Sequence, residues 1–271
     1  MSRHTAAQRL AGRLGSRDIA ILGTLQEFRL MTGGQIKRLY FYTGEPATEA
    51  RKTRATCKRL TELGVIVRLE RRVGGIRAGS DGFVFGLSGM GSAVLDLGET
   101  APSRHRRMPE TKLAFHSHVL AVSELTVRLA EAARADAFSI EELRGEPGCW
   151  RWFSGVGGGQ RALKPDAFLR VSVEEYELAA FIEVDLASES LPTVARKCAV
   201  YIDYWRSGAE QRLHDFFPRV WWLVPHARRL QAIADVLKRL PVDARDLFQV
   251  TQFDHAVRAL TAVPDTEGGA R

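Results

Sequence analysis

The first hundred residues alternate between short amphipathic segments and breaks that contain glycine or proline. Apolar residues at helical spacing predict a first helix over residues 17–29. They are Ile19, Leu22, Leu25 and Phe28. Thr32 can cap a second helix over residues 33–40. A Gly-Glu-Pro turn at 44–46 then precedes a third helix over residues 48–63.

The residues after the third helix predict a two-stranded ribbon. Residues 65–69 form one strand, a glycine-rich loop covers residues 74–82, and residues 83–87 form the return strand. Three helices followed by such a ribbon are typical of a winged helix-turn-helix, which we assign to residues 16–98. The preceding residues 1–15 are basic and rich in small side chains, so we expect a disordered arm.

The pattern changes after a connector over residues 99–136, which contains a long amphipathic helix at 112–135. Strands and helices then alternate through residues 137–262 and predict an α/β domain with a small mixed sheet, followed by a disordered tail over 263–271. The expected strands are residues 138–140, 167–173, 178–184, 219–224 and 247–251, and the expected helices are residues 191–207, 228–240 and 253–261. The fold class of the whole chain is therefore a combination of α+β and α/β.

Charge is distributed unevenly along the 271 residues, whose net charge is +7. Residues 1–110 hold 19 Lys and Arg against 10 Asp and Glu, whereas residues 111–271 hold 20 against 22. This asymmetry predicts an N-terminal region that meets a polyanion. No apolar stretch is long enough to span a membrane. Three scattered cysteines indicate neither a disulfide framework nor a zinc site, so we expect a reducing, cytoplasmic location.

The third predicted helix carries the strongest functional signal. Five cations occupy its exposed side: Arg51, Lys52, Arg54, Lys58 and Arg59. The ribbon adds Arg71, Arg72 and Arg77 at or near its loop. Cations gathered on one helix repel one another in solution, but a phosphate backbone reverses that penalty through counterion release. We therefore predict that these eight residues bind double-stranded DNA, with the third helix in the major groove.

Carboxylates follow the predicted strands of the second domain. Asp166 stands at the start of one strand, and Glu183 and Asp185 stand near the end of the next. Residues two apart on a strand point to the same side, so all three are expected to converge. Three carboxylates form a hard oxygen site that suits Mg or Mn, and a metal so placed can activate water for phosphodiester cleavage.

These residues resemble the motif of the PD-(D/E)xK nuclease family. Pro165-Asp166 is followed by Glu183-Val184-Asp185 and then by a helix that contains Lys197 and Tyr201. The family's lysine position is Asp185 in this chain, so the resemblance implies that Lys197 supplies the amine. The implied catalytic set is Asp166, Glu183, Asp185 and Lys197. The structural alternative is a turn capped by Asp166 and salt bridges from the carboxylates to Lys164, Arg196 or Lys197.

The combination of a basic winged helix with three segments of the second domain resembles the replication-relaxation family of actinobacterial plasmids and integrative elements. The segments are LKPDAFLRV, FIEVDLASES and KCAVYIDYW, and the resemblance covers about residues 17–255. It implies a DNA-binding accessory role in plasmid or mobile-element replication, relaxation or transfer. A relaxase or replication protein is the implied partner, and association with the nucleoid or plasmid is the implied location. The resemblance does not by itself imply an enzyme.

Two alternative functions remain open at the level of sequence. The first is a metal-dependent DNA endonuclease or nickase that uses the carboxylates and Lys197. The second is a winged-helix transcriptional regulator whose second domain forms a homodimer or senses a partner. Two histidines near the start of the long helix, His116 and His118, are two residues apart and so point away from each other, which disfavours a shared metal ion.

Overall fold

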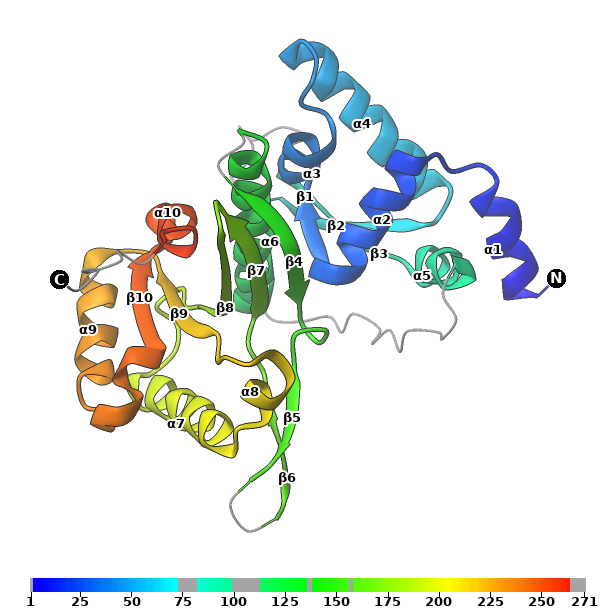
Figure 1. Cartoon of the computed structure of the whole chain (residues 1–271). Coiled ribbons are helices and arrows are strands. Elements are labelled where there is room, and N and C mark those ends of the chain that lie inside the picture. Colours follow the sequence, from blue (N-terminus) through cyan, green and yellow to red (C-terminus); the bar gives the residue numbers. More distant parts are fainter. Residues whose placement is uncertain (1, 73–81, 99–112, 136–137, 156–157, 264–271) are drawn as a thin grey trace. The chain divides into compact units, whose positions relative to one another are not determined.

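The computed structural model describes residues 2–72, 82–98, 113–135, 138–155 and 158–263. The chain divides into two compact units, Met1–Val127 and Arg128–Arg271, which we call the N-terminal and C-terminal units (Figure 1). The mixed α and β class expected from the sequence is confirmed. None of the helices in the described ranges is both long enough and apolar enough to cross a bilayer.

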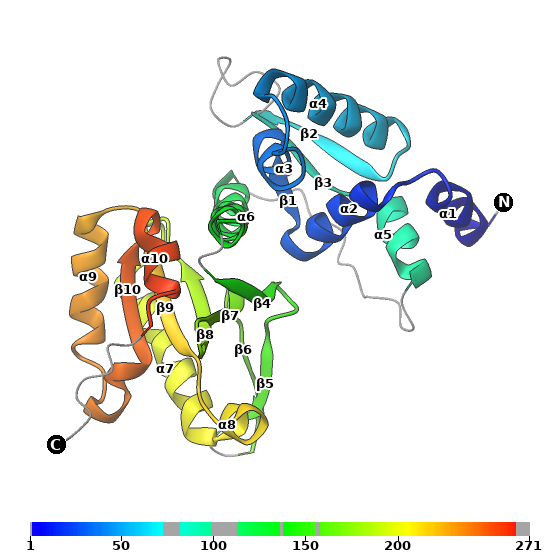
Figure 2. The same ribbon diagram turned by 45° about the horizontal axis from the view of Figure 1, so that its top comes forward.

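The N-terminal unit has the arrangement of a winged helix. Helices come before, between and after the strands of a three-stranded antiparallel sheet of order β1-β3-β2. The helices of this unit are α1 (Arg3–Ala11), α2 (Ser16–Phe28), α3 (Gly33–Tyr40), α4 (Pro46–Glu62) and α5 (Gly89–Leu95), with a short 3-10 turn η2 (Asp96–Gly98). The strands are β1 (Leu30–Thr32), β2 (Ile66–Arg72) and β3 (Phe83–Leu87). Helix α4 packs beside β2, as Figure 2 shows.

The pattern of the sequence predicted α2, α3, α4 and the β2–β3 ribbon, but not β1. This strand has three residues, too few to show a period, and it is defined by its pairing with β3. Arg71 and Arg72 lie at the end of β2, whereas Arg77 and most of the predicted loop lie outside the described residues.

The N-terminal arm is a correction to the sequence-based prediction. Residues 3–11 form helix α1 instead of a disordered arm. Ser2 caps the helix by accepting a hydrogen bond from the Thr5 amide, and α1 packs against α5. Ala7 is completely buried in the core of the unit, so tertiary packing stabilises a helix whose own sequence is mostly polar.

Helix α6 (Leu113–Ala133) matches the long helix predicted at 112–135. Its first part belongs to the N-terminal unit, where polar contacts hold it to α3 and β1. Gln35 donates to the backbone oxygen of Leu120 at 3.1 Å, and the guanidinium of Arg38 pairs with Glu124 at 2.7 Å. The buried hydroxyl of Ser123 donates to the backbone oxygen of Leu30. The connecting helix is thus built into the winged-helix unit at this end.

The C-terminal unit contains a five-stranded mixed sheet of order β10-β9-β8-β7-β4. Strands β4, β7 and β8 form an antiparallel meander, and β8, β9 and β10 are parallel. The sheet strands are β4 (Ser139–Gly145), β7 (Ala167–Val173), β8 (Tyr176–Val184), β9 (Arg219–Val224) and β10 (Phe248–Gln252). A separate hairpin is formed by β5 (Arg151–Ser154) and β6 (Gln160–Leu163). The remaining elements are α7 (Leu191–Ser207), α8 (Ala209–His214), α9 (Ala227–Leu237), η3 (Val242–Leu247), η4 (Phe253–His255) and α10 (Ala256–Leu260).

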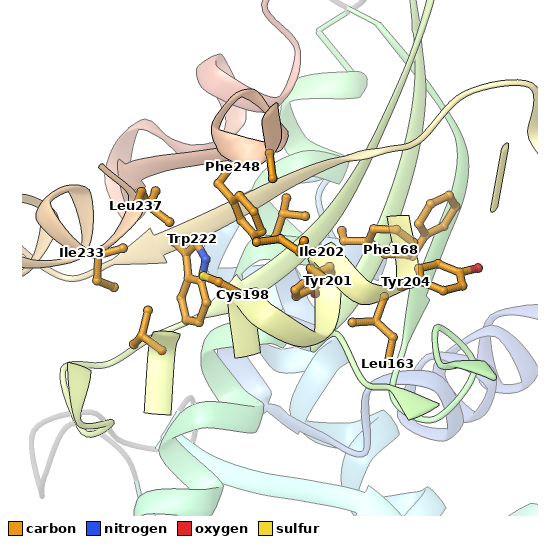
Figure 3. Close-up of a cluster of buried hydrophobic side chains, with 14 of the residues drawn as sticks. Leu163, Phe168, Cys198, Tyr201, Ile202, Tyr204, Trp222, Ile233, Leu237 and Phe248 are labelled. Carbon is orange, nitrogen blue, oxygen red and sulfur yellow. The ribbon is translucent and has the colours of Figure 1, made fainter. Parts of the chain in front are cut away.

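The core of this unit lies between the sheet and helices α7 and α9, which pack side by side (Figures 1 and 2). Figure 3 shows Cys198, Tyr201 and Ile202 of α7 beside Trp222 of β9 and Phe248 of β10. The last five residues of β8 are all buried, which is typical of a central strand covered on both faces. Asp166, next to β7, and Glu183, in β8, therefore lie in a buried part of the sheet.

Candidate functional site

Helix α4 presents its cations to solvent because its opposite side is anchored in the core. Glu45 caps the helix by accepting hydrogen bonds from the amides of Ala47 and Thr48, and Pro46 occupies the first turn, where its missing N–H costs nothing. The buried stripe consists of Glu49, Thr53, Cys57 and Leu60. The side chains of Arg51, Lys52, Arg54, Lys58 and Arg59 are all exposed.

Within the described residues, ion pairs engage three of these five cations. Arg59 pairs at 2.6 Å with Asp18, a buried residue of α2, so it holds α4 against α2. Lys52 and Lys58 pair with Glu49 and Glu62 of their own helix at 3.1 and 3.8 Å. The Lys58–Glu62 pair is exposed on both sides, so it contributes only about 0.3–0.5 kcal/mol. Glu49 is buried, so Lys52 is held by a buried carboxylate and is less available.

Arg51 and Arg54 make no ion pair or hydrogen bond with any residue in the described part of the chain. Together with Lys58 they occupy positions three and four apart, so they form one continuous stripe along the helix. The sequence predicted five equivalent DNA contacts. The structure makes Arg51, Arg54 and Lys58 the most available of them and gives Arg59 a role in packing.

A second group of polar residues gathers where β7 and β8 meet α7. Asp166 immediately precedes β7, and its side chain accepts a hydrogen bond from the amide of Val184 at 2.7 Å. Glu183, near the end of β8, is 1% exposed and interacts electrostatically with Asp166. The predicted convergence of these two carboxylates is therefore present.

Helix α7 supplies the partners of Glu183. One carboxylate oxygen accepts from the ammonium of Lys197 at 2.9 Å, and the other accepts from the hydroxyl of Tyr201 at 2.8 Å. Lys197 also pairs with Glu189 at 2.8 Å. The buried carboxylates thus have a cation provided by the chain itself. Sequence reasoning gave a role to Lys197 but none to Tyr201, although the two are one helical turn apart and so lie on the same face.

Electrostatics in this cluster follow from burial. Burial raises the pKa of Glu183 to about 7, the charge of Asp166 adds to the rise, and Lys197 counteracts it. Burial alone disfavours the charge of Lys197, but Glu183 and Asp166 reverse that effect and raise its pKa. Burial and the neighbouring Glu183 also raise the pKa of Tyr201, so its hydroxyl stays protonated and donates. Lys197 is the positive charge around which the cluster is organised.

Asp185 does not join this cluster, contrary to the expectation that it points to the same side as Glu183. Strand β8 ends at Val184, and the Asp185 side chain turns to accept a hydrogen bond from the amide of Ala187 at 2.6 Å. Its other oxygen accepts from the guanidinium of Arg229 in α9, with one N···O distance of 2.9 Å. Both side chains are nearly buried, at 1% and 11% exposure. The alternation of a strand does not apply once the chain has entered such a turn.

This arrangement does not suit the predicted metal ion. No group of three His, Cys, Asp or Glu side chains within the described ranges is placed to hold one. Both oxygens of Glu183 are already engaged by Lys197 and Tyr201, and Asp185 is engaged by Arg229. Mg²⁺ and Mn²⁺ bind best to several free oxygen ligands. We therefore derive no cleavage step from these residues.

The raised pKa of Glu183 predicts how stability depends on pH. Between its ordinary value of 4.5 and about 7, the folded unit binds the proton more tightly than the unfolded chain does. The free energy of unfolding should therefore fall as pH rises through this window. Thermal unfolding of the Glu183→Gln variant should show a weaker fall than the wild type between pH 5 and 7.5. Glu177→Gln, at an exposed position of the same strand, should keep the wild-type slope.

Comparison with known proteins adds one positive result. A family model described as replication-relaxation matches residues 22–220, which include most of the winged-helix unit, the Glu183 cluster and α7. No curated protein and no solved structure matches the chain.

Proposed function

The chain belongs to the replication-relaxation family, and from this premise we propose that it is a double-stranded DNA-binding accessory factor. Its task would lie in the replication or relaxation of plasmid or mobile-element DNA. The winged-helix unit supplies the DNA contact, and the C-terminal unit acts as a nuclease-like scaffold. A relaxase or replication protein is the partner that this role requires.

The observation that carries the proposal is the stripe of Arg51, Arg54 and Lys58 on α4. At 1.5 Å per residue, a helix of this length extends for roughly 25 Å, enough to cross a major groove. Two of the three cations have no anionic partner among the described residues, so a phosphate or a guanine edge would compensate charges that are otherwise unpaired. The stripe borders the β2–β3 ribbon, which can contact the adjacent backbone.

Titration of a fluorescently labelled duplex at several salt concentrations tests this proposal. Each phosphate contact should contribute about 0.9 to the slope of log Kd against log salt concentration, so three contacts predict a slope near 3 from this stripe alone. A Kd that is independent of salt would contradict the proposal.

The proximity of Asp166, Glu183 and Lys197 favours a second candidate function, a DNA endonuclease. We propose instead that this cluster stabilises the fold, because Lys197 and Tyr201 occupy the oxygens that a metal would need. Supercoiled plasmid incubated with excess protein and Mg²⁺ or Mn²⁺ should then remain supercoiled. Cleavage that disappears in both Asp166→Asn and Glu183→Gln would establish the endonuclease instead. Cleavage that persists in both variants would come from another site or a contaminant.

A further inference from the structure

A hollow of about 350 Å³ lies in the N-terminal unit between α4 and the β2–β3 ribbon. We call it the α4–β3 pocket. Its apolar surface comes from Phe83 and Phe85 of β3 and from Cys57 of α4. Phe85 and Cys57 are buried, and burial raises the pKa of the Cys57 thiol to about 12, so this wall is uncharged. The volume is at the lower end of the range of small-molecule sites, which are mostly apolar with a few placed polar groups.

The rim of the pocket is positively charged. Among the described residues that line it, Arg54 and Lys58 of α4 and Arg68 of β2 are cationic, and Glu62 is the one carboxylate. That carboxylate pairs with Lys58 at 3.8 Å, and both side chains of the pair are largely exposed, so the pair is weak. The guanidinium of Arg68 lies over the ring of Phe83, 4.7 Å from its centroid. The ring and the cation are therefore adjacent parts of the same site.

An apolar cavity with a cationic rim is complementary to one class of small molecule. Phe83 and Phe85 can contact a flat apolar body, and Arg68 and Arg54 can form charge-assisted hydrogen bonds to a carboxylate at its edge. A neutral ligand would use only the cavity, and an inorganic anion would use only the rim. An aromatic carboxylate uses both.

We propose that the α4–β3 pocket binds a small aromatic carboxylate and that the bound ligand weakens binding to DNA. The second half rests on the proposed function, because Arg54 and Lys58 belong both to the pocket rim and to the DNA-binding stripe. A carboxylate bound at the rim neutralises charge on the surface that faces the phosphates. The ligand and the duplex therefore compete for the same cations without a change of fold.

The probe for the first half is 2-naphthoate, observed by saturation-transfer NMR on the full chain. A ligand of this size should bind with a Kd of about 0.1–1 mM, given ordinary ligand efficiencies. The uncharged 2-naphthalenemethanol has the same rings and should bind at least about tenfold more weakly, since tenfold corresponds to the loss of one modest charged contact.

Two variants localise the probe to the pocket. Arg68→Gln removes an exposed rim charge, and Thr61→Phe fills the cavity from a half-buried position of α4. Each should weaken naphthoate binding by about fivefold or more. Arg51→Gln is the matched control, because Arg51 lies on the same helix stripe but does not line the pocket. It should leave naphthoate binding unchanged.

The outcomes separate the pocket from the proposed function. The pocket assignment is overturned if the wild type, Arg68→Gln and Thr61→Phe bind naphthoate with the same Kd, or if none of them binds it. A different result is a chain that binds no naphthoate but self-associates, with Thr61→Phe abolishing the self-association. That result would assign the pocket to a second copy of the chain and would also overturn the proposed ligand. Naphthoate that binds as expected but leaves the Kd for duplex DNA unchanged overturns the competition. A chain that binds naphthoate but no DNA under any salt condition contradicts the proposed function and leaves the ligand site standing.

Discussion

Replacement of Arg229 by methionine should lower the free energy of unfolding of the C-terminal unit by about 3–5 kcal/mol, the usual cost of removing one partner of a buried ion pair. Arg229 holds the carboxylate of Asp185 through two of its nitrogens and donates to the backbone oxygen of Glu189 at 2.7 Å. Methionine fills part of the volume but leaves Asp185 buried without a counter-charge. The connection between β8 and α7 would also lose its link to α9.

Tryptophan fluorescence during urea unfolding measures this effect selectively. All five tryptophans of the chain lie between residues 150 and 222, so the signal reports the C-terminal unit alone. With an m-value of 1–3 kcal/mol/M, the midpoint should shift by roughly 2 M. Arg228→Met is the matched control, because it removes the same charge from the same helix at an exposed position. Its free energy of unfolding should stay within about 0.5 kcal/mol of the wild-type value.

A double-substitution cycle shows why the stability is lost. Asp185→Asn combined with Arg229→Met removes both charges, so the double variant should be more stable than the sum of the two single changes predicts. An Arg229→Met protein as stable as the wild type would contradict the pairing. The assignment of Asp185 to a stabilising ion pair with Arg229 would then be wrong.

The positions of the three carboxylates show which features of this site the sequence can predict and which it cannot. The positions of Asp166 and Glu183 follow from strand periodicity, because each lies in or next to a strand whose apolar run is long enough to recognise. Asp185 is only two residues further, but it lies in a turn where Ala187 adopts a positive φ of 62°. Its partner Arg229 is 44 residues away, in a helix whose docking depends on the whole sheet. No local pattern contains that information.

For the cations of α4, too, the local sequence pattern predicts some features and tertiary contacts determine the others. Amphipathic spacing is enough to place all five on the exposed side of the helix, and the structure agrees. The spacing cannot distinguish Arg59 from its neighbours, because its partner Asp18 lies on another helix 41 residues earlier. Likewise, the mostly polar sequence of residues 1–15 predicted a disordered arm, whereas Ala7 is buried in the core and α1 packs against α5. In both places tertiary contacts determine what the local pattern leaves open.

Charge reversal at two positions of α4, Arg51→Glu and Arg54→Glu, should lower the affinity for duplex DNA by at least about a hundredfold at 0.1 M salt and reduce the salt slope by about 2. Two phosphate contacts are lost, and two carboxylates then face the backbone. The pair is a sharper test than reversal of all five cations, because Arg59→Glu would also place a carboxylate against buried Asp18 and unsettle the fold. Fluorescence anisotropy with a labelled duplex measures both quantities.

The control for this prediction is a chain with the same net charge but an intact α4. Arg228→Glu with Arg239→Glu changes two exposed residues of the C-terminal unit and gives an identical total charge. If binding depends on the α4 surface, this control keeps the wild-type affinity to within a few fold, whereas the α4 variant loses it. Equal losses in both proteins would mean that overall charge attracts the DNA. The proposal that α4 contacts the DNA would then be wrong, because affinity that comes from phosphate contacts to one helix depends on where the charge is removed.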